Sequence, residues 1–166
     1  QENWQQVFET ADRLLALDFT YRREEVDQML FSAFYRSGLE LVERDRLQEA
    51  VRLFDRALEL RPGNTEVSHA KNLANLYMTA MSYWGADWAR AIESLSALYE
   101  LDPQYKDVRE RIFQAYVNHG DVLAEEEAWC QAQEAYTRAL EIEDDPQVRD
   151  QLEQATTQCL ASPTAP

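Results

Sequence analysis

Residues 47–62 read LQEAVRLFDRALELRP, and related stretches follow at 88–103 (WARAIESLSALYELDP) and at 129–146. In each copy, small and apolar side chains stand three and four residues apart, which places them on one side of an α-helix. Each copy ends at a proline, which cannot continue a helix and disfavours helical backbone in the residue before it. The chain therefore contains copies of one helix at a period of 41 residues.

A further helix precedes each copy, so the repeating unit is a helix pair. Val26, Val67 and Val108 coincide upstream of the three copies, and Trp4 begins a fourth copy near the start of the chain. Alternation of β-branched residues is almost absent, so strands are not expected. Such a period is typical of stacked supersecondary units, and the function is therefore expected on a shared surface rather than in a catalytic pocket.

The helix pair resembles the tetratricopeptide repeat. In that family the first helix carries a small residue between two large ones, the second carries an aromatic residue between two small ones, and a proline follows. Repeat 1 matches this pattern at Phe34, Gly38, Leu41, Ala50, Phe54, Ala57 and Pro62, and repeat 3 matches it at Tyr116, Gly120, Leu123, Ala132, Tyr136 and Ala139. The period exceeds the family's usual 34 residues by about two helical turns, which lengthens the first helix without rotating its apolar face.

The resemblance implies an all-α fold, a right-handed α-solenoid of antiparallel helix pairs with about eight helices. We expect a single domain over residues 1–160, followed at 161–166 by a tail with the composition of a Pro/Thr/Ser linker. The expected parts are the second helix of a truncated repeat at 1–19, repeats at 23–62, 64–103 and 105–145, and a capping helix at 146–160.

The first helix of repeat 2 departs from the family pattern. Asn75, Thr79 and Ser82 occupy its large, small and large positions, and a shift of one residue would bring Ala80 and Tyr83 to the inner face instead. Because different residues of this helix face inward, we expect a specialised binding surface here rather than on the other first helices.

The chain is acidic, with a formal net charge of −15 at pH 7. This charge repels the phosphates of nucleic acid and of anionic membranes, so neither is expected as a partner. The negative charge has two alternative explanations: it keeps the protein soluble, or it attracts a basic partner. No stretch approaches the roughly 20 apolar residues that span a bilayer, so no direct membrane insertion is expected.

No motif for catalysis, a metal or a cofactor is recognised, and we predict that the protein is not an enzyme. His69 and His119 are the only histidines, and neither stands at metal-ligand spacing from a cysteine or from the other. His119 falls at an inward position and is predicted to be an interior side chain. The acidic runs 125–127 and 144–145 lack the alternating spacing of a calcium loop and are predicted to be turns.

The two cysteines, Cys130 and Cys159, stand at facing positions of a helical hairpin closed around residues 144–146. A disulfide between them would join the last repeat to the capping helix and would place the protein in an oxidising, extracytoplasmic or secreted compartment. The alternative is a pair of free, partly buried thiols, which is compatible with the cytoplasm.

In the tetratricopeptide family the first helices line a concave groove. The resemblance assigns to that groove Ser32, Tyr35, Arg36, Leu39 and Val42 in repeat 1, Leu73, Leu76, Tyr77, Ala80 and Tyr83 in repeat 2, and Gln114, Val117, Asn118, Asp121 and Ala124 in repeat 3. Its apolar centre favours an apolar or amphipathic peptide or helix of a protein partner over a terminal carboxylate, whose clamp is matched only by Asn118 and Arg36. The alternative is a structural module, in which other copies or other subunits cover these residues.

Overall fold

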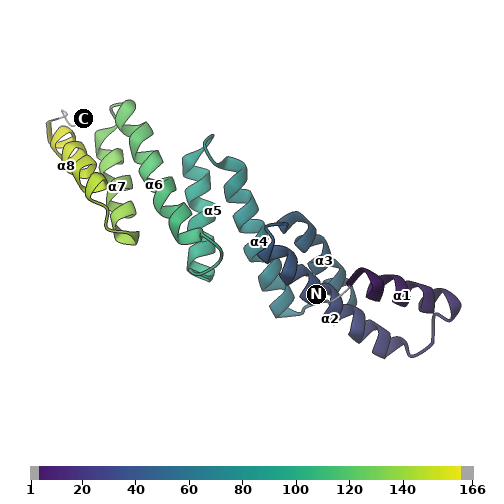
Figure 1. The fold of residues 1–166 in the computed structure, drawn as a ribbon. Coiled ribbons are helices and arrows are strands. Elements are labelled where there is room, and N and C mark those ends of the chain that lie inside the picture. The colour runs from purple at the N-terminus through teal and green to yellow at the C-terminus, as the bar shows by residue number, and fades with distance from the viewer. Residues whose placement is uncertain (1–3, 162–166) are drawn as a thin grey trace. The chain divides into compact units, whose positions relative to one another are not determined.

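The computed structural model describes residues 4–161, and over this range the chain forms eight α-helices and no strand (Figure 1). The helices are α1 (Trp4–Leu17), α2 (Arg23–Glu43), α3 (Leu47–Leu60), α4 (Thr65–Tyr83), α5 (Trp88–Leu101), α6 (Val108–Glu125), α7 (Trp129–Ile142) and α8 (Pro146–Ala161). The expected all-α architecture of consecutive helix pairs is confirmed. The four copies of the repeated helix begin, as predicted, at the first residues of α1, α3, α5 and α7, which are Trp4, Leu47, Trp88 and Trp129. Except for Ala161, the predicted linker lies outside the described residues.

The chain divides into two compact units, Gln1–Met78 and Thr79–Pro166. We call them the N-terminal and the C-terminal unit. The boundary falls within α4, which is continuous in helical backbone from Thr65 to Tyr83. Each unit is described by itself below.

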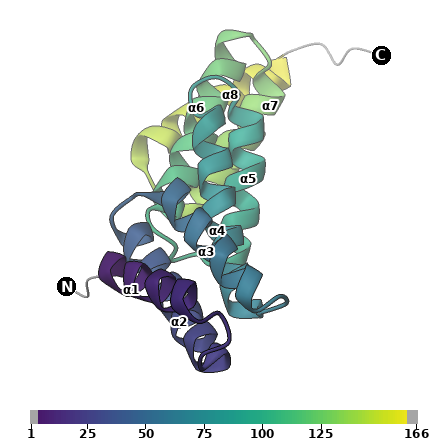
Figure 2. The ribbon, with the colours of Figure 1, turned by 90° about the vertical axis from the view of Figure 1, so that its right-hand side faces the viewer.

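In the N-terminal unit, drawn in purple and blue in Figure 2, α2 packs against both α1 and α3. The rings of Phe8 on α1 and Phe34 on α2 stack with their centroids 4.6 Å apart. Phe54 of α3 is completely buried in the same cluster, together with Ala50 and Ala57 one helical turn away on either side. The small–aromatic–small pattern of the sequence therefore forms the core of this unit.

Two glycines allow the helices of a pair to approach closely. A Cβ added to Gly38 would lie 2.8 Å from Cδ1 of Phe54 and closer still to Cε1, and a Cβ added to Gly120 would lie 2.5 Å from Cε1 of Tyr136. Such distances are too short for non-bonded carbon atoms. Glycine is therefore required here by packing, since both positions lie inside a helix.

In the C-terminal unit, α5, α6, α7 and α8 pack in consecutive pairs. The core between α7 and α8 contains Tyr136, Val148 and Ala155, which are at most 3% exposed. On α4, Ala80 is buried and Thr79 is exposed, as the shift of one residue in repeat 2 predicts.

The helix ends are set by local polar contacts. Asn64, Asp87 and Asp145 each accept a hydrogen bond from the backbone N–H three residues later, at 2.9, 3.0 and 3.1 Å, and so cap the starts of α4, α5 and α8. Between the helices of a pair, Asp45 and Glu127 stand at the same repeat position and adopt positive φ angles of 61° and 59°. These residues end the first helices of repeats 1 and 3 by taking the left-handed conformation, and Gly85, with φ 78°, does so in repeat 2.

Candidate functional site

The residues of α2 that were predicted to line the groove differ in their accessibility. Tyr35 is half-buried, and its hydroxyl donates a hydrogen bond to Oε1 of Glu66 at the start of α4, at 3.0 Å. Arg36 is exposed, and Leu39 is 39% exposed. Arg36 and Leu39 are therefore accessible to a partner, whereas the polar end of Tyr35 is engaged within the N-terminal unit.

The predicted groove residues of α4 fall into two groups. Leu73, Tyr77 and Ala80 are buried, with at most 7% of their surface exposed, so these side chains pack in the interior. Leu76 and Tyr83 are partly exposed, and the guanidinium carbon of Arg90 lies 5.4 Å from the centre of the Tyr83 ring. The changed phase of α4 accounts for this division, because repeat position alone had placed all five residues on one surface.

In α6, the predicted residue Asp121 is part of a polar network that joins three helices. Its Oδ1 accepts hydrogen bonds from the hydroxyl of Tyr136 on α7, at 2.8 Å, and from Nε2 of Gln151 on α8, at 2.7 Å. Burial and the bond to Asp121 raise the pKa of Tyr136. Asn118 donates to the backbone oxygen of Gln114, at 2.8 Å, and Gln114 itself is exposed. Asp121 thus has a structural partner on each neighbouring helix.

A groove of about 660 Å³ lies between α1 and α2. We call it the α1–α2 groove, and its lining residues are Trp4, Gln6, Val7, Thr10, Met29, Ser32, Ala33 and Arg36. Met29 is 46% exposed, and Trp4 is held in place by a hydrogen bond from Nε1 to Oε1 of Glu40, at 2.9 Å. Two residues predicted for the family groove, Ser32 and Arg36, are therefore brought together with apolar side chains of α1.

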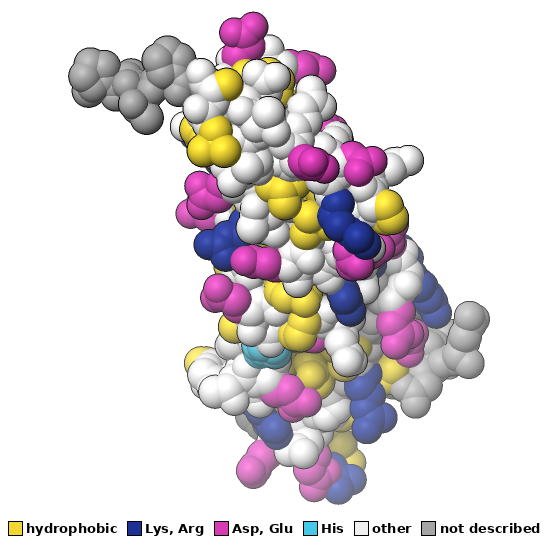
Figure 3. All heavy atoms as spheres, turned by 90° about the vertical axis from the view of Figure 1, so that its left-hand side faces the viewer, with side chains coloured by type: hydrophobic (Ala, Val, Ile, Leu, Met, Phe, Trp, Pro, Cys, Tyr) yellow, Lys and Arg dark blue, Asp and Glu magenta, His cyan; other side chains and the backbone are white. Residues whose placement is uncertain are grey.

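A second groove, of about 790 Å³, lies among α5, α6 and α7. We call it the α5–α7 groove. Ile112, Tyr116, His119 and Leu123 of α6 line it, together with residues of α5 and α7, and none of the predicted groove residues does. Figure 3 shows hydrophobic side chains reaching the surface between acidic and basic ones on the face that it draws. The repeat alignment contained a signal for this groove, because Ala135 stands where repeat 1 has Leu53.

His119 is partly buried, in agreement with its predicted inward position. Burial lowers the pKa of its imidazole, while the negative charges of Asp87 and Glu126 act in the opposite direction. Across residues 4–161, no three His, Cys, Asp or Glu side chains are gathered in a way that could hold a metal ion.

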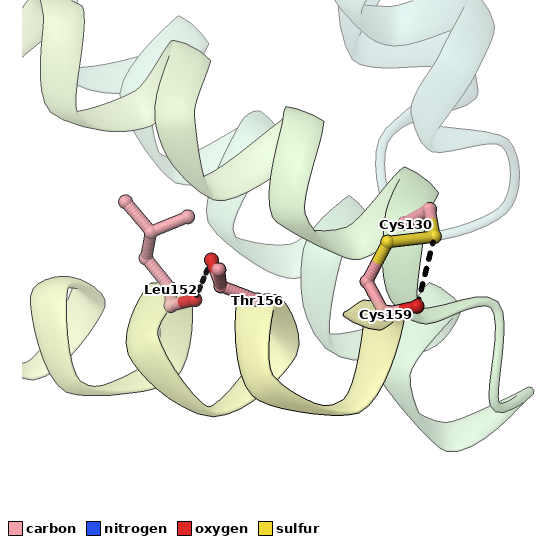
Figure 4. Close-up of a disulfide and its surroundings, with 4 residues drawn as sticks. All are labelled: Cys130, Leu152, Thr156 and Cys159. Carbon is pink, nitrogen blue, oxygen red and sulfur yellow. Dashed lines mark hydrogen bonds between the residues drawn. A yellow bond between two sulfur atoms is a disulfide. The ribbon is translucent and has the colours of Figure 1, made fainter. Parts of the chain in front are cut away.

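The predicted pairing of Cys130 with Cys159 is confirmed by the structure, in which the two sulfurs are bonded and the Cα atoms lie 4.8 Å apart (Figure 4). Cys130 is in the first turn of α7, and Cys159 is in the last turn of α8. The bridge therefore ties the open end of this hairpin, opposite the turn that contains Asp145.

We expect the phenol of Tyr35 to ionise at a higher pH than that of an ordinary tyrosine. Burial, with added contributions from the hydrogen bond to Glu66 and its negative charge, raises the pKa of Tyr35 from 10.0 to about 12. Because folding favours the neutral phenol, this contribution to stability is complete below pH 10 and is lost as the pH rises towards 12. In a pH titration followed by phenolate absorbance, the variant Tyr35→Phe should lack one of the transitions that the wild type shows at high pH. In the variant Glu66→Gln, that transition should occur at a lower pH. Identical curves for the three proteins would contradict this assignment.

The sequence matches no protein-family model and no curated protein. The similarity to the tetratricopeptide repeat consequently depends on the residues quoted above and on their positions in the helix pairs. Among the described helices, none combines the length and the apolar character needed to cross a membrane.

Proposed function

We propose that the protein is a non-catalytic interaction scaffold of the tetratricopeptide type, which holds an amphipathic helix of a protein partner in the α1–α2 groove. Support comes from the C-terminal unit, where a surface of the same kind is partly covered by a helix of the chain itself. The pairs α1–α2 and α7–α8 have the same composition. Each consists of a second-type helix, which begins at the recurring Trp or Leu position, followed by a first-type helix, which corresponds to the first helix of a repeat.

The two pairs correspond residue by residue. Trp4 and Trp129 begin the two second-type helices, and Ala33 and Ala155 each follow a buried valine by seven residues. On α7 and α8, α6 packs against part of this surface through Ala124, and a smaller pocket of about 400 Å³ remains beside it, lined by Trp129, Gln154 and Ala155 among others. The observation that carries the proposal is that the corresponding surface of α1 and α2 forms an open groove.

The chemistry of the groove suits an amphipathic helix. Val7, Met29 and Ala33 provide an apolar base, and Arg36 and Gln6 provide polar groups at the edges. A helix with apolar residues three and four positions apart would bury them on the base, while an acidic residue of the same helix would pair with Arg36. Apolar anchors of this kind supply most of the binding energy in helix-in-groove complexes.

The test uses a fluorescent peptide with the sequence of α6, residues 108–125, because α6 packs against part of the corresponding surface. We expect saturable binding that Met29→Glu weakens at least about tenfold, since a carboxylate would be desolvated against the apolar face of the peptide. The matched control is Gln154→Glu, which places the same charge on the exposed surface of α8. Absence of binding, or equal loss in both variants, would overturn the proposal.

A second candidate function is assembly with other copies. Leu160 of α8 is 83% exposed, and it stands at the repeat position of Gly38 and Gly120, where a first-type helix faces its own second-type helix. A large apolar side chain at this position would suit a helix contributed by another molecule. Light scattering of the eluting protein distinguishes the two functions: an oligomer that Leu160→Glu dissociates supports assembly, and a monomer supports the scaffold.

A further inference from the structure

We infer that the α5–α7 groove is a second docking site and that it takes a basic amphipathic helix of a protein partner. This site is formed by other helices than the α1–α2 groove and does not depend on the function proposed for that groove. Three features of the groove point to such a partner: small side chains line it, its floor is mostly apolar, and its edge is acidic.

The groove is present where the side chains are smaller than those at the corresponding positions of the N-terminal unit. Ile92 and Ala135 line the groove, and their counterparts in α1 and α3 are Phe8 and Leu53. Phe8 stacks on Phe34, and both Phe8 and Leu53 pack against the core of the N-terminal unit. The C-terminal unit therefore has space at positions where the N-terminal unit has side chains.

The floor of the α5–α7 groove is mostly apolar, with His119 between Tyr116 and Leu123. Ile112 is buried beneath it, and Tyr116 and Leu123 extend along α6 one and three helical turns further on. Ile142 closes the end formed by α7. Water in contact with such a floor is displaced favourably by apolar side chains of a partner.

The edge of the groove is acidic. Glu100, Glu134 and Glu141 line it with a single cation, Arg138, which pairs with Glu141 at 3.0 Å. Glu100 and Glu134 take part in no ion pair within the described part of the chain, although Glu134 is close enough to Arg138 for their charges to attract. The edge therefore carries two carboxylates that a partner's lysine or arginine side chains could neutralise.

The charges at this edge are placed differently from those at the corresponding positions of the N-terminal unit. The counterparts of Glu100 and Glu134 are Ala16 and Arg52, whereas Asp12 and Glu49 are the counterparts of Ser96 and Gln131, which also line the groove. At the edge of the α5–α7 groove itself, charge complementarity selects a basic partner. The flanking helices α5 and α7 have 14 residues each, about 21 Å, which is the length of a partner helix of four turns.

The probe is a synthetic helical peptide of four turns, with leucines along one face and lysines on both sides of that face. A second peptide carries glutamates in place of the lysines. Fluorescence anisotropy at physiological salt should show binding of the lysine peptide and none of the glutamate peptide, because the acidic edge attracts one and repels the other.

Two variants of the protein separate docking in the groove from general attraction to an acidic chain. Ala135→Leu introduces the side chain found in repeat 1 and fills the groove without changing the charge, and Glu134→Gln removes one exposed carboxylate from the edge. Ala135→Leu should weaken binding of the lysine peptide at least about tenfold, and Glu134→Gln should weaken it about two- to fivefold, as expected for one exposed ion pair. The control Glu153→Gln removes an exposed carboxylate from α8, away from the groove, and should leave binding unchanged.

Circular dichroism of Ala135→Leu confirms that the variant is folded, and Glu134→Gln provides the test if it is not. Equal affinity of the lysine peptide for the wild type, Ala135→Leu and Glu134→Gln would overturn the inference, as would the absence of binding to the wild type. Met29→Glu, in the α1–α2 groove, should not affect binding of the lysine peptide. Failure of this proposal is therefore distinguishable from failure of the scaffold function.

Discussion

Replacing Phe54 with alanine is expected to lower the free energy of unfolding by about 3–5 kcal/mol, the usual cost of truncating a completely buried phenylalanine. Phe54 has no exposed surface and packs against Gly38, so neighbouring side chains have little freedom to close the cavity. Urea unfolding followed by circular dichroism measures this loss. Phe19, which is 67% exposed, is the matched control, and Phe19→Ala should cost less than about 1 kcal/mol.

A double-substitution experiment tests why glycine is found opposite this ring. Gly38→Ala alone should cost about 1–3 kcal/mol, because the added methyl group overlaps the ring of Phe54. Repeat 2 has Leu95 at the position of Phe54, and Phe54→Leu should recover part of the loss caused by Gly38→Ala. Strictly additive effects of the two substitutions would contradict a direct contact between residues 38 and 54.

Removal of the disulfide between Cys130 and Cys159 is expected to lower the stability of the C-terminal unit by about 3–4 kcal/mol in the chain-entropy model. The bridge connects residues 29 positions apart, and it restricts the unfolded chain more than the folded hairpin. The measurement compares urea unfolding of the oxidised protein with that of the variant Cys130→Ser/Cys159→Ser.

The control is the addition of a reducing agent, which should destabilise the wild type and leave the double-serine variant unchanged. Thiol labelling of the unreduced, denatured protein should find no reactive cysteine. Two reactive thiols, or equal stability of the oxidised and reduced wild type, would contradict the bridge as a source of stability. Formation of the bridge in the cell would indicate an oxidising compartment, which labelling of the freshly extracted protein can test.

Much of the fold could be predicted from the sequence because each helix pair is specified locally. The starts of α3, α5 and α7 at Leu47, Trp88 and Trp129 follow from the period. The ends of α3 and α5 follow from Pro62 and Pro103, whereas Pro146 begins α8. The facing positions of Cys130 and Cys159 follow from the closing turn of one hairpin. In these cases the relevant partners are close in sequence, so helix periodicity is sufficient.

The candidate sites were less predictable, because they depend on side-chain volumes contributed by several helices. Repeat position assigned Leu73 and Tyr77 to a groove surface, but both are buried in the structure. It also treated Asp121 as a surface residue, although Tyr136 and Gln151 bind its carboxylate. A position in a repeat defines a direction around the helix axis, but it does not define what the neighbouring helix places there.

The sequence by itself determined the helices, their pairing and the small-to-large contacts at Gly38 and Gly120, because period, proline and glycine act within one helix pair. Only the tertiary structure decided where the grooves lie. The α1–α2 groove is open because no described helix covers it, and the α5–α7 groove is open because Ile92 and Ala135 are smaller than Phe8 and Leu53. Such spaces are differences between the volume that the helices enclose and the volume that their side chains fill, and this difference exists only after packing.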